Sequence, residues 1–268
     1  MTENLLLVSS KRDLASINMA HHLIEKHGFE ETSERFEDDQ IYRKGKVGLI
    51  QTSKELLHLE DLKFNPEAYI FLSRHRSESG IPTLTAHFPG NFSDEALYGG
   101  RPRELGYTYP TLHQRYLKRL KQLQDRVPEY KVVTEPMHHG PSSFSRPVLF
   151  VEIGSSEEQW QDQVAVETVC EAVMKTVEDR YSAEKISLGF GGTHYSEKFT
   201  NLIVESEYAL GAIMPKYALP NLDKSILHQM ATKSVEKISY AVLDWKGVKD
   251  RARVVSLVED AGLEIVKI

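Results

Sequence analysis

The stretch Gly189-Phe-Gly-Gly-Thr-His-Tyr-Ser-Glu-Lys-Phe199 joins an apolar strand end to paired glycines, a histidine and a helix start. Gly191 and Gly192 have no Cβ, so the backbone can turn sharply there and approach a ligand closely. His194 stands on the turn, where a side chain can point into a cleft at the end of a sheet. The stretch therefore predicts a strand–turn–helix unit of an α/β protein, with a functional residue in the turn.

Two other segments show the same order of strand, histidine and glycine, namely Thr83-Leu-Thr-Ala-His-Phe-Pro-Gly90 and Val132-Val-Thr-Glu-Pro-Met-His-His-Gly140. Strands and helices alternate over nearly the whole chain, which predicts an α/β fold with a mixed, mostly parallel sheet between helical layers. Ligands bind at the carboxyl ends of strands in such folds. We therefore expect one site, built from separate loops of a single domain that spans residues 1–268.

Hydrophobic periodicity gives the expected elements. Strands are expected at residues 5–8, 47–51, 69–73, 84–88, 130–134, 148–153, 186–190, 208–214, 240–245 and 263–268. Helices are expected at residues 14–28, with Gly28 closing the helix, and at 225–238 and 250–261, with another beginning near Thr111. Ser155 and Glu158 have capping-box spacing and predict one long helix with an apolar stripe from Val166 to Val177.

Composition restricts the class of protein. The chain is 40% hydrophobic and 27% charged, and no apolar run approaches the roughly 20 residues that span a bilayer. The first four residues lack the basic segment of a signal peptide. The single cysteine, Cys170, fits a reducing cytoplasm and lies in an apolar stripe, which favours a buried thiol over a nucleophile. The net charge of −6 argues against broad nucleic-acid binding but permits a local basic patch.

Histidines at the predicted strand ends suggest a metal centre. Imidazole and carboxylate groups are the usual ligands of a hydrolytic zinc, so we expect zinc bound by His75, His87, His139 and His194, with Glu152 beside it. Neighbouring residues on an extended segment point to opposite faces, so His139 is preferred over its neighbour. Taken one at a time, each histidine is more typical of a packed or surface residue than of a metal ligand.

Two segments could bind phosphate. Ser10, Lys11 and Asp13 open the first helix, where free N–H groups attract anions, although a plain helix cap with solvated charges explains them nearly as well. Arg74 and Arg76 carry guanidinium groups that can grip phosphate in a bidentate manner. A basic face on the helix near Thr111, with Arg115, Lys118 and Arg119, could hold a nucleic-acid backbone or be ordinary solvated surface.

At these residues the chain resembles a known family, the archaeal and plant type of D-aminoacyl-tRNA deacylase. The segments that carry the resemblance, in order, are Asp13–Asn18, Ser73–Asn91, Met137–Pro141 and Gly191–Tyr195. The resemblance implies a zinc-dependent enzyme that cleaves the ester between a D-amino acid and the 3′ end of tRNA. It also implies an α/β fold related to phosphorylase and peptidyl-tRNA hydrolase folds.

Under this resemblance we expect water to attack the ester carbonyl with help from His194, His139 and Glu152. Backbone N–H groups of Gly191 and Gly192 would receive the oxyanion. Substrate binding would fall to Tyr195 and to the candidate phosphate ligands named above.

Two rival functions use the same residues. One is a metal-dependent hydrolase of a small amide or ester, without tRNA. The other is a non-catalytic module that binds an anion or nucleotide, in which the histidines are structural. A monomer or a small homo-oligomer is expected in each case.

Overall fold

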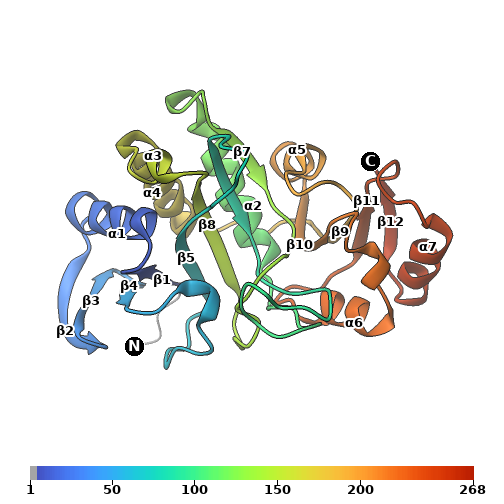
Figure 1. The fold of residues 1–268 in the computed structure, drawn as a ribbon, viewed down its shortest axis with the longest axis horizontal. Coiled ribbons are helices and arrows are strands. Elements are labelled where there is room, and N and C mark those ends of the chain that lie inside the picture. Colours follow the sequence, from blue (N-terminus) through green and yellow to red (C-terminus); the bar gives the residue numbers. More distant parts are fainter. Residues whose placement is uncertain (1–4) are drawn as a thin grey trace.

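The computed structural model describes residues 5–268 and divides their strands between two sheets (Figure 1). Residues 1–4, on which the signal-peptide expectation rests, lie outside this description. The larger sheet has the strand order β2-β3-β4-β1-β5-β8-β6-β7 and the smaller one the order β10-β9-β11-β12. The α/β class is therefore confirmed, whereas alternation alone did not reveal the division into two sheets.

The bounds of the elements are as follows. The larger sheet contains β1 (Leu5–Ser10), β2 (Glu30–Phe36), β3 (Asp39–Lys44), β4 (Val47–Thr52), β5 (Ala68–Arg74), β6 (Thr83–His87), β7 (Lys131–Thr134) and β8 (Val148–Gly154). The smaller sheet contains β9 (Lys185–Phe190), β10 (Tyr208–Met214), β11 (Tyr240–Leu243) and β12 (Glu264–Lys267). The helices are α1 (Leu14–Lys26), α2 (Pro110–Gln122), α3 (Glu157–Trp160), α4 (Gln163–Glu178), α5 (Glu197–Glu205), α6 (Lys224–Thr232) and α7 (Arg251–Asp260), with short 3₁₀ turns η1 (Leu56–His58), η2 (Gln124–Arg126) and η3 (Leu219–Asn221).

Strand direction in the larger sheet is mixed. β1, β4, β5 and β8 run parallel to one another, whereas β6 and β7 are parallel to each other and β6 is antiparallel to β8. The carboxyl ends of β5 and β6 therefore lie at opposite edges of the sheet. The sequence analysis predicted a site at one common edge, where the carboxyl ends of the strands would meet. In the structure the candidate residues extend over a face of the sheet instead.

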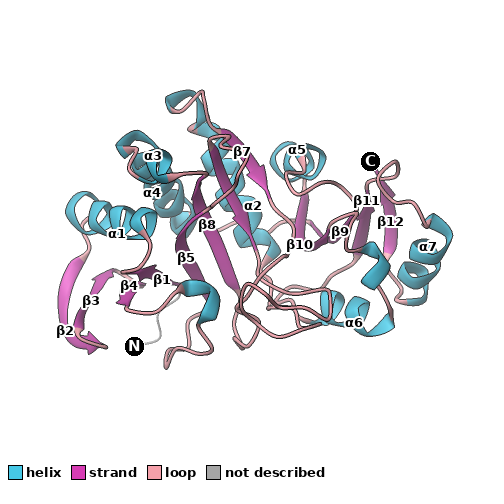
Figure 2. Ribbon diagram, in the orientation of Figure 1, coloured by secondary structure: helices cyan, strands magenta, loops and turns pink. Residues whose placement is uncertain are grey.

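The two faces of the larger sheet are covered differently, because successive side chains of a strand point to opposite sides. One face packs on α1, α2 and α4 and forms the main apolar core, which continues into the smaller sheet. The other face carries a smaller cluster that includes Phe71, Phe144 and Phe150, and no α-helical residue of the described chain belongs to it. Helices were expected on both faces, but loops and η1 cover this one (Figure 2).

The helix α2 packs against strands of both sheets. Within it, the fully buried His113 places Nδ1 3.1 Å from the carbonyl oxygen of Leu210 on β10, and Nε2 3.1 Å from the hydroxyl of Thr134 on β7. This histidine links the two sheets and has a structural role.

The expected long helix after β8 is interrupted. Ser156 and Gln159 form the capping box, one residue later than predicted, and it caps only the single turn of α3. Asp162 then caps α4 by accepting from the N–H groups of Val164 and Ala165. Cys170 is fully buried on α4, as predicted. Within residues 5–268, no helix is long and apolar enough to cross a bilayer.

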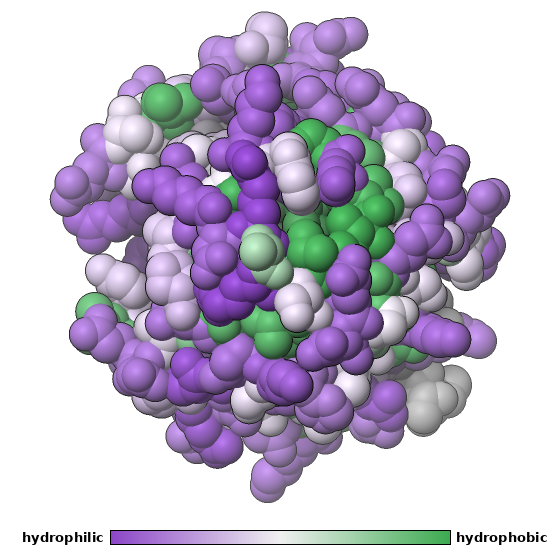
Figure 3. Space-filling view, turned by 90° about the vertical axis from the view of Figure 1, so that its right-hand side faces the viewer, coloured by the Kyte–Doolittle hydropathy of each residue, from purple (hydrophilic) through white to green (hydrophobic). Residues whose placement is uncertain are grey.

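The end of the molecule that carries α7 and β12 shows an apolar area framed by polar side chains (Figure 3). On the edge strand β12, Ile265 and Val266 are partly exposed between the exposed residues Glu264 and Lys267. Charges on an edge strand oppose pairing with another sheet.

Candidate active site

Five histidines and two glutamates gather on the helix-free face of the larger sheet. His75 follows β5, His87 ends β6, Glu135, His138 and His139 follow β7, Glu152 lies on β8, and His194 lies between β9 and α5. Only His194 comes from the smaller sheet. His194 Nε2 lies 3.1 Å from Glu135 Oε2, and the rings of His75 and His194 are 6.2 Å apart. The cluster therefore joins segments that are up to about 120 residues apart in the chain.

Strand alternation explains the position of Glu152. Phe150 and Glu152 lie two residues apart on β8 and therefore share a face. The ring of His87 stacks on Phe150, with centroids 5.3 Å apart. Glu152 places Oε2 3.3 Å from His75 Nδ1 and from the hydroxyl of Thr85, and Oε1 3.9 Å from His87 Nε2. This carboxylate, buried among the imidazoles, was expected in the site.

Glu135 was not singled out from the sequence. Its side chain has no exposed surface, and its carboxylate lies 3.2 Å from His75 Nδ1, 3.6 Å from His138 Nε2 and 3.1 Å from His194 Nε2. It directly follows β7, three positions before His138, so its place at a strand end was the available signal. Glu135 thus contacts three imidazoles of the cluster, whereas Glu152 contacts two.

The main chain fixes the tautomers of three histidines. Each uses Nδ1 to contact a carbonyl oxygen of its own segment, and because a carbonyl can only accept, each Nδ1 carries the proton. The contacts are His87 to Phe88 at 3.1 Å, His138 to Pro136 at 2.8 Å and His139 to Gly140 at 2.6 Å. In the neutral ring, Nε2 then keeps its lone pair, which is the form that binds metals.

The ionisation of the cluster is uneven. Burial and the neighbouring imidazoles lower the pKa of His138 and of His139, the latter to about 4. Burial also lowers the pKa of His75, but its hydrogen bond to Glu152 and the charge of Glu135 outweigh burial and raise it to about 10. Burial raises the pKa of each glutamate, yet the surrounding histidines hold both below their ordinary value. At neutral pH, Glu135 and Glu152 are therefore ionised, His138 and His139 are neutral, and His75 is an imidazolium.

Several atoms of the cluster lack a hydrogen-bond partner among residues 5–268. They are Nε2 of His87 and both carboxylate oxygens of Glu135. A lone pair of His138 Nε2 faces a Glu135 oxygen at 3.6 Å, an arrangement that repels unless a cation lies between them. The pKa of His87, lowered by burial but raised overall by Glu152, reflects the same attraction for positive charge at Nε2. These buried groups could hold a metal ion.

The donor atoms fall into three overlapping groups whose atoms lie within 4.8 Å of one another. The groups are His87 with His138 and His139, His75 with Glu135 and His194, and His87 with Glu135 and Glu152. The four histidines predicted as ligands are thus all present in the cluster but are divided between two groups. Which of them bind a metal stays a prediction.

His138 corrects a specific expectation. The sequence argument allowed only one of the pair His138–His139 to face the site, because it took the segment as extended. β7 ends at Thr134, and the residues after it form a loop, so alternation does not apply. The two rings lie 4.4 Å apart and belong to the same group of donor atoms.

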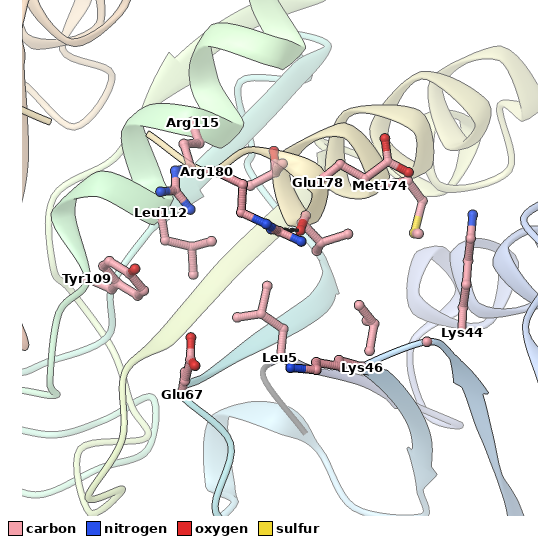
Figure 4. Close-up of a pocket in the computed structure, with 14 residues that line it drawn as sticks. Leu5, Lys44, Lys46, Glu67, Tyr109, Leu112, Arg115, Met174, Glu178 and Arg180 are labelled. Carbon is pink, nitrogen blue, oxygen red and sulfur yellow. Dashed lines mark hydrogen bonds between the residues drawn. The ribbon is translucent and has the colours of Figure 1, made fainter. Parts of the chain in front are cut away.

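The cluster opens into a cleft of about 650 Å³. His75, His138, His139, Glu152 and His194 are among the residues that line it. A smaller hollow of about 300 Å³ lies at the amino end of β1, beside Leu5, Lys46 and Arg180 (Figure 4). The cleft is lined instead by Ser10 at the carboxyl end of β1, and no histidine lines the smaller hollow, so the cleft is the candidate site.

Comparisons with known proteins agree with this geometry. A protein-family model described as D-aminoacyl-tRNA deacylase matches residues 62–266. The D-aminoacyl-tRNA deacylase of Pyrococcus furiosus is 34% identical over 98% of this chain and 99% of its own length. That of Methanococcus vannielii is 37% identical over 91% of each chain. The chain belongs to the D-aminoacyl-tRNA deacylase family.

A solved structure shares the fold. It is a crystal structure of a conserved protein of unknown function, with a TM-score of 0.91 and 30% identity to this deacylase family member, covering 98% of this chain and 94% of the other. The match extends over both sheets.

The predicted phosphate ligands of the deacylase occupy different positions. Ser10 donates its hydroxyl hydrogen to the carbonyl of Lys54 at the cleft wall, and Lys11 pairs with Asp39 on β3. Lys11 does not line the cleft, whereas the next residue, Arg12, does. The predicted turn therefore contributes to the cleft lining through Ser10 and Arg12, and not through Lys11.

Asp13 has a supporting role. It caps α1 by accepting from the Ser16 N–H at 3.0 Å, and it accepts from the Arg74 N–H at 2.7 Å. Burial raises the pKa of Asp13 to about 6, although these backbone hydrogen bonds oppose the effect. Its carboxylate fastens the loop that carries Arg74 and Arg76, both of which line the cleft.

The Gly191–Tyr195 turn positions side chains of the site. Gly191 has φ +100° and donates its N–H to the carbonyl of Met214 at 2.9 Å, so it is not free to bind an oxyanion, contrary to expectation. A Cβ on Gly192, where φ is +74°, would lie 2.7 Å from the hydroxyl of Ser196, so this turn requires glycine. The turn delivers Tyr195, whose hydroxyl lies 2.6 Å from His75 Nε2.

The basic face of α2 does not extend into the cleft. Arg119 pairs with Asp179, and Lys118 donates to the carbonyl of Ser206 at 2.9 Å. Arg115 lies over the ring of Tyr181 at 5.3 Å. These cations already have partners within this deacylase, which favours the structural interpretation of that face.

Proposed function

We propose that this protein hydrolyses the ester of D-aminoacyl-tRNA with a bound zinc, releasing the free D-amino acid and tRNA. Membership of the deacylase family supports the reaction. The observation that carries the zinc proposal is the set of three imidazoles whose protons are fixed on Nδ1, beside carboxylate oxygens without hydrogen-bond partners. The three rings are preoriented, and in its neutral form each presents an Nε2 lone pair to a cation.

In our proposal, His87, His138 and His139 hold one zinc, because three histidines with an open position are typical of catalytic zinc. When bound, zinc supplies Lewis acidity to the ester carbonyl and to water. The fit rests on donor chemistry: neutral nitrogen from buried rings and ionised oxygen from buried acids.

Proton transfer falls to His194 in this proposal. It is the most exposed histidine of the cluster, with 36% of its side chain accessible, and it lines the cleft. Glu135 Oε2 lies 3.1 Å from its Nε2 and can orient the ring. Glu152, expected as a proton carrier, is 2% exposed and is better placed to balance the charge of His75.

The cleft suits the phosphates of a tRNA end. Arg12, Arg74 and Arg76 line it, and the guanidinium of Arg74 lies 5.3 Å from the ring of Trp160. We expect the double variant Arg74→Ala, Arg76→Ala to raise KM for D-tyrosyl-tRNA and to leave kcat nearly unchanged. Each lost phosphate contact should lower the slope of log affinity against log salt by about 1.

A matched control for this double variant is Arg180→Ala, in the hollow of Figure 4 at the other end of β1. Its kinetics and salt slope should equal those of the wild type. An unchanged KM in the double variant would show that these guanidiniums do not bind substrate.

The deciding experiment measures hydrolysis of D-tyrosyl-tRNA and L-tyrosyl-tRNA, with and without a chelator. We expect release from the D substrate alone, loss with chelator and recovery with zinc. Turnover that survives complete metal removal would refute the zinc proposal but not the deacylase proposal. We place the activity in the cytoplasm, where tRNA is aminoacylated, and in one domain, because the core is continuous across the two sheets.

The rival functions predict other outcomes. A small-amide hydrolase would act on aminoacyl amides and leave tRNA esters intact, while a binding module would turn over neither substrate. The partnerless atoms of the cluster disfavour the binding module, because histidines with a purely structural role resemble His113, with both ring nitrogens satisfied.

A further inference from the structure

Tyr98 is an exposed aromatic residue at the cleft. Its exposed fraction is 65%, and it lines the cleft together with His138 and His139. No ring of the described chain stacks on it. An exposed aromatic side chain in a catalytic cleft offers a flat apolar surface to a ligand.

The main chain around Tyr98 is held firmly. Its carbonyl accepts the N–H of Gly140 at 3.1 Å, and Gly140 directly follows His139. The next carbonyl, that of Gly99, accepts from the side-chain amide of Asn91 at 2.9 Å. A Cβ on Gly99 would lie 2.0 Å from the carbonyl oxygen of Leu57, so the loop packs directly on η1. The ring is therefore presented from a fixed backbone, which lowers the entropy lost when it binds.

The chemistry of the cleft lining changes from one part to another. Arg12, Arg74 and Arg76 come from the turns after β1 and β5, and they provide positive charge. Leu56, Leu57 and Tyr98 come from η1 and the loop after β6, and they provide apolar surface. The ester-bearing end of a tRNA has a matching division, because its last ribose carries a base on one carbon and a phosphate on another.

We propose that Tyr98 stacks on the terminal adenine of the tRNA substrate. The proposal rests on the proposed deacylase function and names the part of the substrate that the apolar section of the cleft receives. Protein aromatics stack on unpaired bases of RNA ends, and stacking needs no further hydrogen-bond donor from the protein. With the base on Tyr98 and the phosphate at the arginines, the ribose lies between them and its ester faces the histidine cluster.

The test compares Tyr98→Ala, Tyr98→Phe and the control Leu97→Ala in the zinc-supplied enzyme. Leu97 is the neighbouring exposed apolar residue, 76% accessible, and does not line the cleft. Two substrates are used: the D-tyrosyl ester of adenosine and D-tyrosine methyl ester, which has no base. Inhibition by adenosine 5′-monophosphate gives a second readout that does not depend on the rate of hydrolysis.

We expect Tyr98→Ala to raise KM for the adenosine ester by roughly tenfold or more, in line with the loss of one base–aromatic stack. It should weaken inhibition by adenosine 5′-monophosphate by a similar factor and leave the methyl ester unaffected. Tyr98→Phe should restore both values, and Leu97→Ala should match the wild type.

Equal losses on both esters would overturn the proposal, because they would show damage to the cluster instead of a lost stack. Unchanged kinetics in Tyr98→Ala would overturn it as well. If either of these two results is found and the wild-type protein hydrolyses D-tyrosyl-tRNA, the proposed function stands while the Tyr98 inference fails. If the wild type hydrolyses none of these substrates, the proposed function itself fails.

Discussion

Replacing Glu135 by glutamine is expected to reduce deacylation by roughly 10²- to 10⁴-fold, the range associated with loss of a positioned acid–base group. The amide has nearly the same volume, so the fold should persist. It carries no charge, however, and cannot balance His75 while serving His138 and His194, all within 3.6 Å of the carboxylate. Single-turnover hydrolysis of D-tyrosyl-tRNA, bound metal content and thermal unfolding should be measured together.

The matched control is Glu236→Gln. Glu236 accepts two hydrogen bonds, from the N–H of Thr111 at 2.8 Å and from its hydroxyl at 2.5 Å. It belongs to the loop between α6 and β11 and contacts the start of α2, outside the cluster. Its substitution should leave turnover unchanged. A Glu135→Gln protein with wild-type turnover and metal content would show that this acid only fills space.

His87→Ala is expected to have the second large effect, on metal content and on turnover. Loss of a hydrogen-bond partner behind a metal ligand typically costs 10- to 100-fold in affinity or activity, and loss of a ligand itself costs at least about as much. The fully buried ring has a partnerless Nε2 and belongs to two of the three donor groups. Metal analysis after gel filtration and turnover at saturating substrate give the two readouts.

His113→Gln separates this effect from ordinary core damage. His113 is equally buried, but both of its ring nitrogens have partners. Its substitution should lower the free energy of unfolding by about 1–3 kcal/mol, the cost of an unsatisfied buried group, and leave metal content intact. If His87→Ala lost stability alone, in the manner of His113→Gln, His87 would be a packing residue.

The sequence predicted the α/β class and most strands, because buried strands and amphipathic helices leave clear periodic patterns. It missed the hairpin of β2 and β3, whose residues are mostly exposed or half-buried and lack apolar alternation. It also could not show that β6 runs antiparallel to β8, since strand direction depends on partners far away in the chain. Because the direction of β6 was unknown, the site was expected at the edge where the strands end, whereas it lies on a face of the sheet.

The candidate site could also be predicted only in part from the sequence. His75, His87, His139, Glu152 and His194 are chemically conspicuous residues beside strands, and the structure brings all five together. The sequence did not distinguish Glu135 from the other acidic residues, because its contacts with three imidazoles are apparent only in the structure. Lys11 and Arg12 differ only in the direction of their side chains, which helix-start patterns do not encode.

The carbonyls that fix the protons of His87, His138 and His139 belong to the peptide backbone, within two residues of each ring. No side-chain replacement can delete a peptide oxygen. A saturation scan of this region should therefore show sharp intolerance at the imidazoles and at Glu135, whereas replacement of other cleft side chains should leave the tautomers of these three rings in place. Redesign of the surrounding cleft for other esters could proceed without disturbing the tautomers on which the site depends.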